Sequence, residues 1–308
     1  MNINRRTFLK QIGAIAALMT CSPTKAAEKI SALSSDTKQL TLLHTNDVHS
    51  HIEPFAASDP KYAGLGGYAR RKAYIDAVRN EGNEVLVFDC GDIFQGTPYF
   101  NLYDGRLEIE LMNKMGIDGA TIGNHEFDNG IESLCDRMEE ANFPFICANY
   151  SFVTERAQNL VKPYKIFERC GRKIGVLGLG IKIEGLINTK KAGGTIYNDP
   201  IETANTIAAE LRRQGCSLII ALSHLGYTMK GQTDDVAVAS QSRDIDIILG
   251  GHTHTFMSEP VSVANSEGRN VWINQVGYAG INIGRFDVIF DDTTDTASVI
   301  THHAIVMA

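Results

Sequence analysis

The sequence predicts an α/β fold in which two stacked β-sheets are flanked by helices. Short runs rich in Val, Ile and Leu recur along the chain with little apolar–polar alternation, as expected for strands covered on both faces. Amphipathic stretches of helical period separate several of these runs. After Gly250 the helical pattern stops and strand-like segments follow one another. An α/β first part that closes with a β-rich tail favours layered sheets with helices outside.

The N-terminal segment has the composition of an export signal rather than of a folded element. Residues 1–27 are interpreted as the signal, 28–39 as a polar linker and 40–308 as the folded domain. The basic stretch Asn4–Lys10 precedes a short apolar run, Ile12–Met19, which is typical of a cleavable signal. Two adjacent arginines followed by Phe-Leu-Lys favour the twin-arginine route to the periplasm or cell envelope.

The position of signal cleavage is left open by the sequence. Leu18–Cys21 resembles a lipoprotein box, in which case Cys21 would carry a lipid anchor and provide the only membrane contact. Cleavage near Ala26 or Ala27 is the alternative.

Strands and helices are expected in alternation up to the tail. The expected strands are Leu40–Thr45, Val85–Asp89, Gly119–Ile122, Pro144–Ala148, Ile174–Gly178, Leu218–Leu222 and Ile245–Leu249, followed in the tail by Val271–Val276, Ile281–Phe290 and Ala297–Val306. The expected helices are Tyr68–Asn80, Leu107–Met115, Ile131–Glu140 and Ile201–Gln214. Pro200 and Gly215 bracket the last of these helices as start and stop signals.

Charge and cysteine content narrow the function classes. The 308 residues carry a formal net charge of −7, whereas a groove for a nucleic-acid polymer needs clustered Lys and Arg. A small anionic substrate is compatible with this charge, because metal ions can reverse the local sign of a site. Beyond Cys21, the cysteines are odd in number and widely spaced, so no disulfide framework is expected.

Five polar clusters follow directly after predicted strands. They are Asp47-Val-His49, Gly91-Asp-Ile-Phe-Gln95, Gly123-Asn-His-Glu126, Ser223-His224 and Gly250-Gly-His-Thr-His254. The carboxyl ends of strands in an open α/β sheet converge on one crevice, so these clusters are expected to meet. His302 and His303 lie in the tail, away from the clusters, and are expected on the surface.

The residue types in these clusters suit a pair of divalent metal ions. Asp, His and Asn without Cys favour Mn, Zn or Fe, and the sequence does not choose among them. Two ions about 4 Å apart need a bridging carboxylate and further ligands for each. Asp92, in a tight Gly-Asp turn, is the expected bridge.

The order of the clusters resembles the calcineurin-like metallophosphoesterase family, whose motifs are DxH, GDxxQ, GNHE, a lone histidine after a strand, and GHxH. Longer strings narrow the resemblance to the 5′-nucleotidase and UDP-sugar hydrolase group: Leu43-His-Thr-Asn-Asp-Val-His49, Gly91-Asp-Ile-Phe-Gln-Gly-Thr97, Gly123-Asn-His-Glu-Phe-Asp128 and Gly250-Gly-His-Thr-His254. The resemblance runs from about Leu40 to about Asp291 and implies the four-layer fold of that family.

The resemblance also implies which residues bind metal and which act on the substrate. One metal ion would be held by Asp47, His49, Asp92 and His254, and the second by Asp92, Asn124, His224 and His252. His125 would act on the substrate phosphate and its leaving group instead of binding metal, and Asp128 would orient it. The alternative for Asp128 is a cap on a helix that begins near Asn129. A metal-bridging hydroxide would attack phosphorus while His125 assists.

Full-length members of the nucleotidase branch resemble a two-domain clamp whose second domain binds the base and the phosphates. The sequence ends at Ala308, where that domain would begin. Three explanations stay open: a separate chain supplies the second half, the site accepts phosphomonoesters loosely, or the substrate is different. The other activities considered are a cyclic-nucleotide or other phosphodiesterase, a thiosulfate-releasing hydrolase, and a metal-binding interaction module without turnover. The retained His125 and Asp128 disfavour the last of these.

Overall fold

The computed structural model describes residues 38–291 and 296–308. The predicted export signal, the lipid-anchor candidate Cys21 and all but the end of the predicted linker lie outside the described residues. No helix in the described ranges is both long and apolar enough to cross a membrane.

Two β-sheets form the centre of the domain. The first has seven strands in the order β15 (Thr296–Val306), β14 (Asn282–Asp291), β1 (Gln39–Thr45), β2 (Glu84–Asp89), β3 (Gly119–Ala120), β4 (Phe145–Ile146) and β6 (Val161–Lys162). The second has six in the order β12 (Val261–Ala264), β13 (Asn270–Asn274), β11 (Ile247–Leu249), β10 (Cys216–Ser223), β8 (Arg172–Leu179) and β7 (Tyr164–Arg169). Strands β5 (Tyr150–Ser151) and β9 (Ile196–Tyr197) pair separately.

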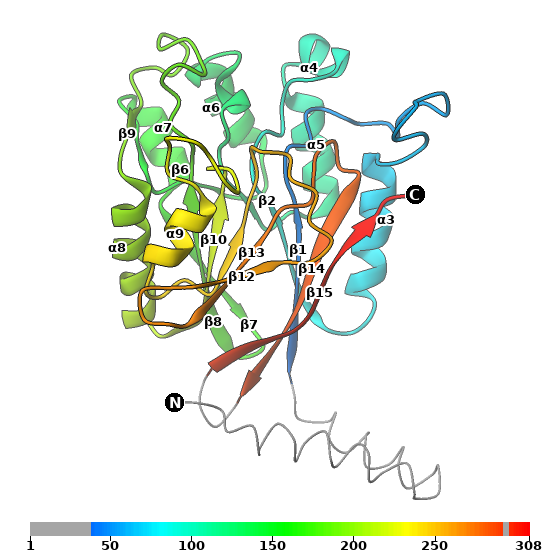
Figure 1. Cartoon of the computed structure of the whole chain (residues 1–308). Coiled ribbons are helices and arrows are strands. Elements are labelled where there is room, and N and C mark those ends of the chain that lie inside the picture. Colours follow the sequence, from blue (N-terminus) through cyan, green and yellow to red (C-terminus); the bar gives the residue numbers. More distant parts are fainter. Residues whose placement is uncertain (1–37, 292–295) are drawn as a thin grey trace, which may run out of the picture. The chain divides into compact units, whose positions relative to one another are not determined.

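Both sheets are parallel at the centre and antiparallel at an edge. Strands β1, β2, β3, β4 and β6 run parallel, as do β8, β10, β11 and β13. Strands β14, β15, β7 and β12 join antiparallel. The parallel arrangement brings the carboxyl ends of the central strands to one edge of each sheet, toward the top of Figure 1.

The layers follow from the alternation of side chains along each strand. Leu40 and Leu42 of β1 belong to a buried cluster between the two sheets, where they meet Leu218 and Ile220 of β10. Leu43 points the other way, into a cluster under the helices of the first sheet. The order is therefore helices, sheet, sheet, helices, and the predicted four-layer fold is confirmed.

The outer layers consist of short helices. They are α3 (Tyr68–Arg79), α4 (Pro98–Tyr103), α5 (Arg106–Met115), α6 (Ile131–Glu140), α7 (Glu155–Leu160), α8 (Pro200–Arg213) and α9 (Asp235–Gln241), with a 3-10 turn η2 (His125–Phe127). Helices α3, α5 and α6 contribute to the buried cluster of the first sheet, and α8 and α9 to that of the second. Figure 1 shows α3 and α8 on opposite sides of the paired sheets.

Capping chemistry explains where α8 begins. Asp199 accepts hydrogen bonds from the backbone N–H groups of Ile201 and Glu202, and Pro200 occupies the first turn. Gly215 follows the helix with a positive φ of 84°. Both predicted signals of this helix are confirmed.

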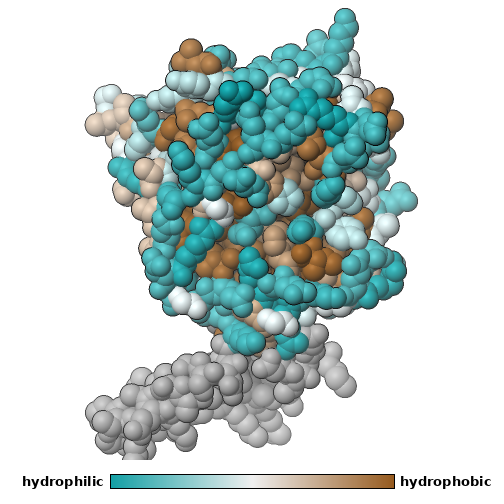
Figure 2. All heavy atoms as spheres, turned by 180° about the vertical axis from the view of Figure 1, so that it is seen from behind, coloured by the Kyte–Doolittle hydropathy of each residue, from teal (hydrophilic) through white to brown (hydrophobic). Residues whose placement is uncertain are grey.

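Polar and apolar residues share the surface of the domain on the face drawn in Figure 2. On the face opposite the view of Figure 1, apolar residues show as separate groups among polar ones (Figure 2). The described cysteines are all buried, and Cys90, Cys135, Cys147 and Cys216 are free thiols. None of these four thiols forms a disulfide, which agrees with the prediction.

Truncation of Ile220 is expected to destabilise the domain. Its side chain is fully buried between the sheets, so Ile220→Ala should lower the free energy of unfolding by about 2–5 kcal/mol. Urea denaturation of the variant measures this change. Ile196→Ala, at a side chain that is 58% exposed, is the control and should change stability by about 0.5 kcal/mol or less. Equal losses in both variants would contradict the layered core.

Candidate metal centre

The five predicted clusters meet at the carboxyl ends of strands from both sheets. Asp47, Asp92 and Asn124 follow β1, β2 and β3 of the seven-stranded sheet. His224 and His252 follow β10 and β11 of the six-stranded sheet. Since the two sheets pack face to face, their edges bring these five loops together.

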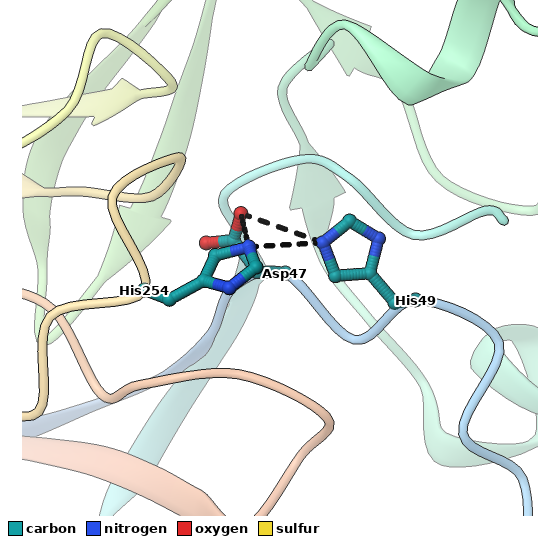
Figure 3. Close-up of side chains that lie close together, drawn as sticks. All are labelled: Asp47, His49 and His254. Carbon is teal, nitrogen blue, oxygen red and sulfur yellow. Dashed lines mark hydrogen bonds and ion pairs between the residues drawn. The ribbon is translucent and has the colours of Figure 1, made fainter. Parts of the chain in front are cut away.

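Three side chains from two loops that are distant in the sequence form the first group that could hold a metal ion. His254 Nε2 lies 3.2 Å from Asp47 Oδ1 and 3.0 Å from His49 Nε2. His49 Nε2 is 3.9 Å from Asp47 Oδ1. Figure 3 shows the three polar ends pointing toward one another. The group has the donor types that the sequence predicted.

Asp92 lies between this group and a second one. Its Oδ2 is 3.9 Å from His49 Nε2 and 3.0 Å from His224 Nε2. His252 completes the second group with Asp92 and His224, and its Nδ1 lies 3.0 Å from Asn124 Oδ1. One carboxylate therefore faces donors on both sides, which is the arrangement required of a bridge.

The loops that carry these groups have an unusual backbone. Asp47, His49, Asp92, His252 and His254 all have positive φ, between 49° and 73°. Non-glycine residues rarely adopt this left-handed conformation, and it concentrates at functional sites. The sequence showed glycines beside the clusters but did not show that the polar residues themselves turn the chain.

Glu126 fixes the turn that contains Asp92. Its carboxylate accepts hydrogen bonds from the backbone N–H groups of Asp92 at 2.9 Å, Ile93 at 2.7 Å and Gly123 at 2.6 Å. Burial and the nearby Asp92 charge raise the pKa of Glu126 to about 7. Glu126 thus joins the loop after β2 to the loop after β3.

The buried histidines are held by one ring nitrogen while the other faces the carboxylates. His224 Nδ1 donates to the Cys90 carbonyl at 2.7 Å, and His49 Nδ1 is 3.2 Å from the Phe94 carbonyl. These contacts fix the ring orientation and leave Nε2 of both histidines directed at Asp92 and Asp47. Such outer contacts are typical of metal-binding histidines.

The electrostatics of the site favour a bound cation. Asp47 and Asp92 are both buried, and the fully buried His224 Nε2 lies 3.0 Å from Asp92 Oδ2 and 3.9 Å from Asp47 Oδ1. Burial disfavours the charged form of His224, but the charges of Asp92 and Asp47 outweigh it and raise its pKa. The attraction that holds a proton there would act more strongly on a divalent ion. The residues therefore fit a metal site.

His125 and Asp128 form a pair at the rim of the centre. His125 Nδ1 lies 2.7 Å from Asp128 Oδ2, and the backbone N–H of His125 donates to Asp92 Oδ1 at 2.8 Å. The hydrogen bond to Asp128 raises the pKa of His125 although burial opposes this. Asp128 does not cap α6, because that helix begins at Ile131 after Gly130 and has no side-chain cap.

Gln275 is a residue of the site that the sequence analysis missed. Its side chain is fully buried, and its amide donates to the Gly251 carbonyl at 2.6 Å. Its Oε1 accepts from Thr253 Oγ1 at 3.0 Å and from the Thr255 backbone N–H at 3.1 Å. One side chain thus shapes the loop that carries His252 and His254. No motif identifies it, since it lies after β13, beyond the last cluster.

Gln275→Leu is expected to weaken metal binding by about 10–100-fold, because loss of a contact that orients ligands has effects of this size. Competition with a fluorescent chelator measures the affinity. Gln241→Leu, at an exposed position at the end of α9, is the matched control and should bind metal as the unmodified chain does. Unchanged binding in Gln275→Leu would contradict the role of this side chain.

A cluster of Asp, His and Asn donors at the shared edge of two stacked sheets has the composition of a divalent-metal centre. Residues 40–256 match the family model described as calcineurin-like phosphoesterase, and the chain belongs to that family. Its similarity is to 5′-nucleotidases in particular. The snake venom 5′-nucleotidase of Crotalus adamanteus is 34% identical over 274 residues, which cover 82% of this chain and 46% of the relative.

Two further proteins extend this likeness. The 5′-nucleotidase of Bos taurus is 31% identical over 286 residues, covering 86% of this chain and 48% of the relative. The crystal structure of a 5′-nucleotidase precursor from Thermus thermophilus superposes with a TM-score of 0.79 at 32% identity, covering 87% of this chain and 54% of that one. The chain therefore spans about half the length of each of these three proteins.

Proposed function

We propose that the chain is an exported phosphomonoesterase of the 5′-nucleotidase type that works with two divalent metal ions. The observation that carries this proposal is the position of Asp92. Its carboxylate lies between two groups of donors, and the His125–Asp128 pair stands beside them. The similarity to 5′-nucleotidases supports the substrate class.

The ligand sets follow the two groups of donors. Asp47, His49, Asp92 and His254 would hold one ion. Asp92, Asn124, His224 and His252 would hold the other. Mn, Zn and Fe all suit these donors. When bound, the ions supply an activated water and polarise the phosphoryl oxygens.

His125 would stabilise charge on the substrate as the ester bond breaks. Asp128 accepts from Nδ1, so it orients the ring and favours the protonated form. The His125 side chain is 32% exposed, which leaves its second nitrogen available to a phosphate or leaving-group oxygen. A positioned imidazolium can donate a proton to the departing alkoxide, a contribution typically worth about 10²–10⁴-fold in rate.

The substrate would be a small phosphorylated molecule, with a nucleotide favoured by the similarity. Because the chain matches about half of the snake venom and bovine 5′-nucleotidases, recognition of the base would fall to further sequence or to a separate chain that supplies the substrate-binding domain. Export by the twin-arginine route, with or without a lipid on Cys21, would put the activity in the periplasm or cell envelope.

Phosphate release from AMP tests the proposal. The chain from Thr37 to Ala308 would be loaded with Mn²⁺ or Zn²⁺ and compared on AMP, an aryl phosphate and a bis-aryl phosphate. Preference for AMP would support a nucleotidase. Turnover of the aryl monoester alone would support a hydrolytic centre that relies on another domain for specificity. Preference for the diester would favour a phosphodiesterase. If two ions bind but none of the three substrates is hydrolysed, a metal-binding interaction module would be favoured.

A further inference from the structure

His254 differs from His224 and His49 in how its ring is held. His224 and His49 each have Nδ1 within 3.2 Å of a backbone carbonyl oxygen. His254 Nε2 faces Asp47 and His49, but within residues 38–291 and 296–308 no hydrogen bond is made to its Nδ1. Its side chain is 40% exposed, whereas that of His224 is fully buried.

An aromatic ring takes the place of that hydrogen bond. The rings of His254 and Tyr278 are stacked, with centroids 5.2 Å apart and an interplanar angle of 11°. Stacking restricts the tilt of the imidazole, but it restrains rotation within the ring plane less than a hydrogen bond does. The Asp47–His49–His254 group in Figure 3 therefore has one ligand that is held less firmly than the others.

Tyr278 is itself supported by three further rings, which together with it form an aromatic brace: Phe55, Tyr62, Phe256 and Tyr278. The centroid of Tyr278 lies 5.7 Å from that of Tyr62, 6.0 Å from Phe256 and 6.4 Å from Phe55, in edge-to-face arrangements. Tyr62 and Phe256 also stack on each other at 6.0 Å. The brace joins the loop after β1 to the loop after β11.

The backbone around Tyr278 ties it to the loops that carry two of the donors. The Gly277 N–H donates to the Thr255 carbonyl at 3.0 Å, beside His254, and the Ala279 N–H donates to the Asp47 carbonyl at 2.7 Å. A Cβ at Gly277 would lie 2.3 Å from the Phe256 ring, so the close packing of the brace requires glycine there. Tyr278 is thus fixed relative to both Asp47 and His254.

We propose that Tyr278 is the positioning residue for His254, and that the ion position of Asp47, His49 and His254 is the weaker and more readily emptied of the two. The inference rests on the proposed two-ion assignment. Its physical reason is that one ligand of this position is half exposed and held by stacking, whereas His224 of the other position is buried and held by a hydrogen bond.

The experiment measures metal binding directly. The full chain is freed of metal and titrated with Mn²⁺ in a calorimeter. We expect two binding steps of different affinity in the unmodified protein. Tyr278→Leu should weaken the weaker step by about 10-fold and leave the stronger within about 3-fold. His254→Ala should abolish the same weaker step, which identifies the position.

Two control variants show whether weaker metal binding comes from the loss of ring stacking or from a defect in folding. Tyr278→Phe keeps the ring and should titrate like the unmodified protein. Tyr103→Leu removes an exposed tyrosine that stacks on Tyr99 and should also have no effect. If Tyr278→Leu fails to fold, Tyr62→Leu, which weakens the brace but keeps the stacked ring, should weaken the same step by a smaller factor.

The outcomes distinguish this inference from the proposed function. Two steps in the unmodified protein, with both or neither weakened by Tyr278→Leu, would overturn the role of Tyr278 and leave the two-ion assignment standing. Fewer than two ions bound to the unmodified protein would overturn the assignment and the inference together. Selective weakening of one step, shared with His254→Ala, would support both.

Discussion

Asp92→Ala is expected to empty both ion positions and to lower phosphoester hydrolysis by at least about 10³-fold. The carboxylate is buried, and its Oδ2 faces His49 on one side and His224 on the other. Burial favours the neutral acid, but His224 and His49 outweigh it and hold the pKa of Asp92 below its usual range. The anion that attracts both ions is therefore present at any working pH.

Elemental analysis after gel filtration measures the metal content, and initial rates on the best substrate measure activity. Asp136→Ala is the matched control, since it removes an aspartate from the exposed face of α6 that pairs with Arg156, away from the metal centre. Metal content and rate should not change in that control. If Asp92→Ala kept both ions, Asp92 would not be the bridge and the ligand sets would have to be redrawn.

His125→Ala is expected to lower the turnover number by about 10²–10⁴-fold while the metal content stays at two ions per chain. The His125 ring lies at the rim of the centre and pairs with Asp128, so its loss removes a proton donor without removing a proposed ligand. The backbone N–H of His125, which donates to Asp92 Oδ1, is kept in the alanine variant.

Comparison with Asp128→Asn refines this test. The amide can still accept from Nδ1 but carries no charge, so turnover should fall by less than in His125→Ala. Metal loss in His125→Ala would contradict the assignment of His125 as a proton donor that binds no metal. His125 lies close enough to His49 and Asp92 to serve as a ligand, so the test is a real one. Rates on a substrate with a good leaving group should recover in part, since such a group needs no proton.

The fold could be predicted because local pattern and global layering agree. Strands β1, β2, β8 and β10 were recognisable as apolar runs, and α8 by Pro200 and Gly215 at its ends. The shorter elements were not. Strand β7 carries a mixed sequence at an edge, and α9 has only seven residues, so neither has enough periodicity to stand out.

The metal-donor side chains of the candidate site could also be predicted, because they lie in polar clusters directly after the strands and these strand ends share one edge of the sheets. The side chains that hold those donors were not predictable in the same way. Gln275 and Tyr278 act through contacts between loops far apart in the chain, and single-sequence patterns contain no such information. His303 is exposed, as expected. His302 was also expected on the surface, and this was wrong: it is half-buried, and its ring packs 5.4 Å from Trp272 and 6.1 Å from Phe286.

The left-handed backbone at five of the donors places stability and chemistry in conflict. A non-glycine residue in that conformation costs about 1 kcal/mol or more, and glycine relieves the cost at the same position. At His254, whose side chain is 40% exposed, glycine would relieve this cost and remove a proposed ligand. A screen for heat resistance on metal-free protein should therefore favour glycine at that position, and the survivors would lack one proposed metal ligand. At Asp47 and Asp92 the same change would leave the backbone N–H groups of His252 and His125 without their acceptors, so the screen should not select it there.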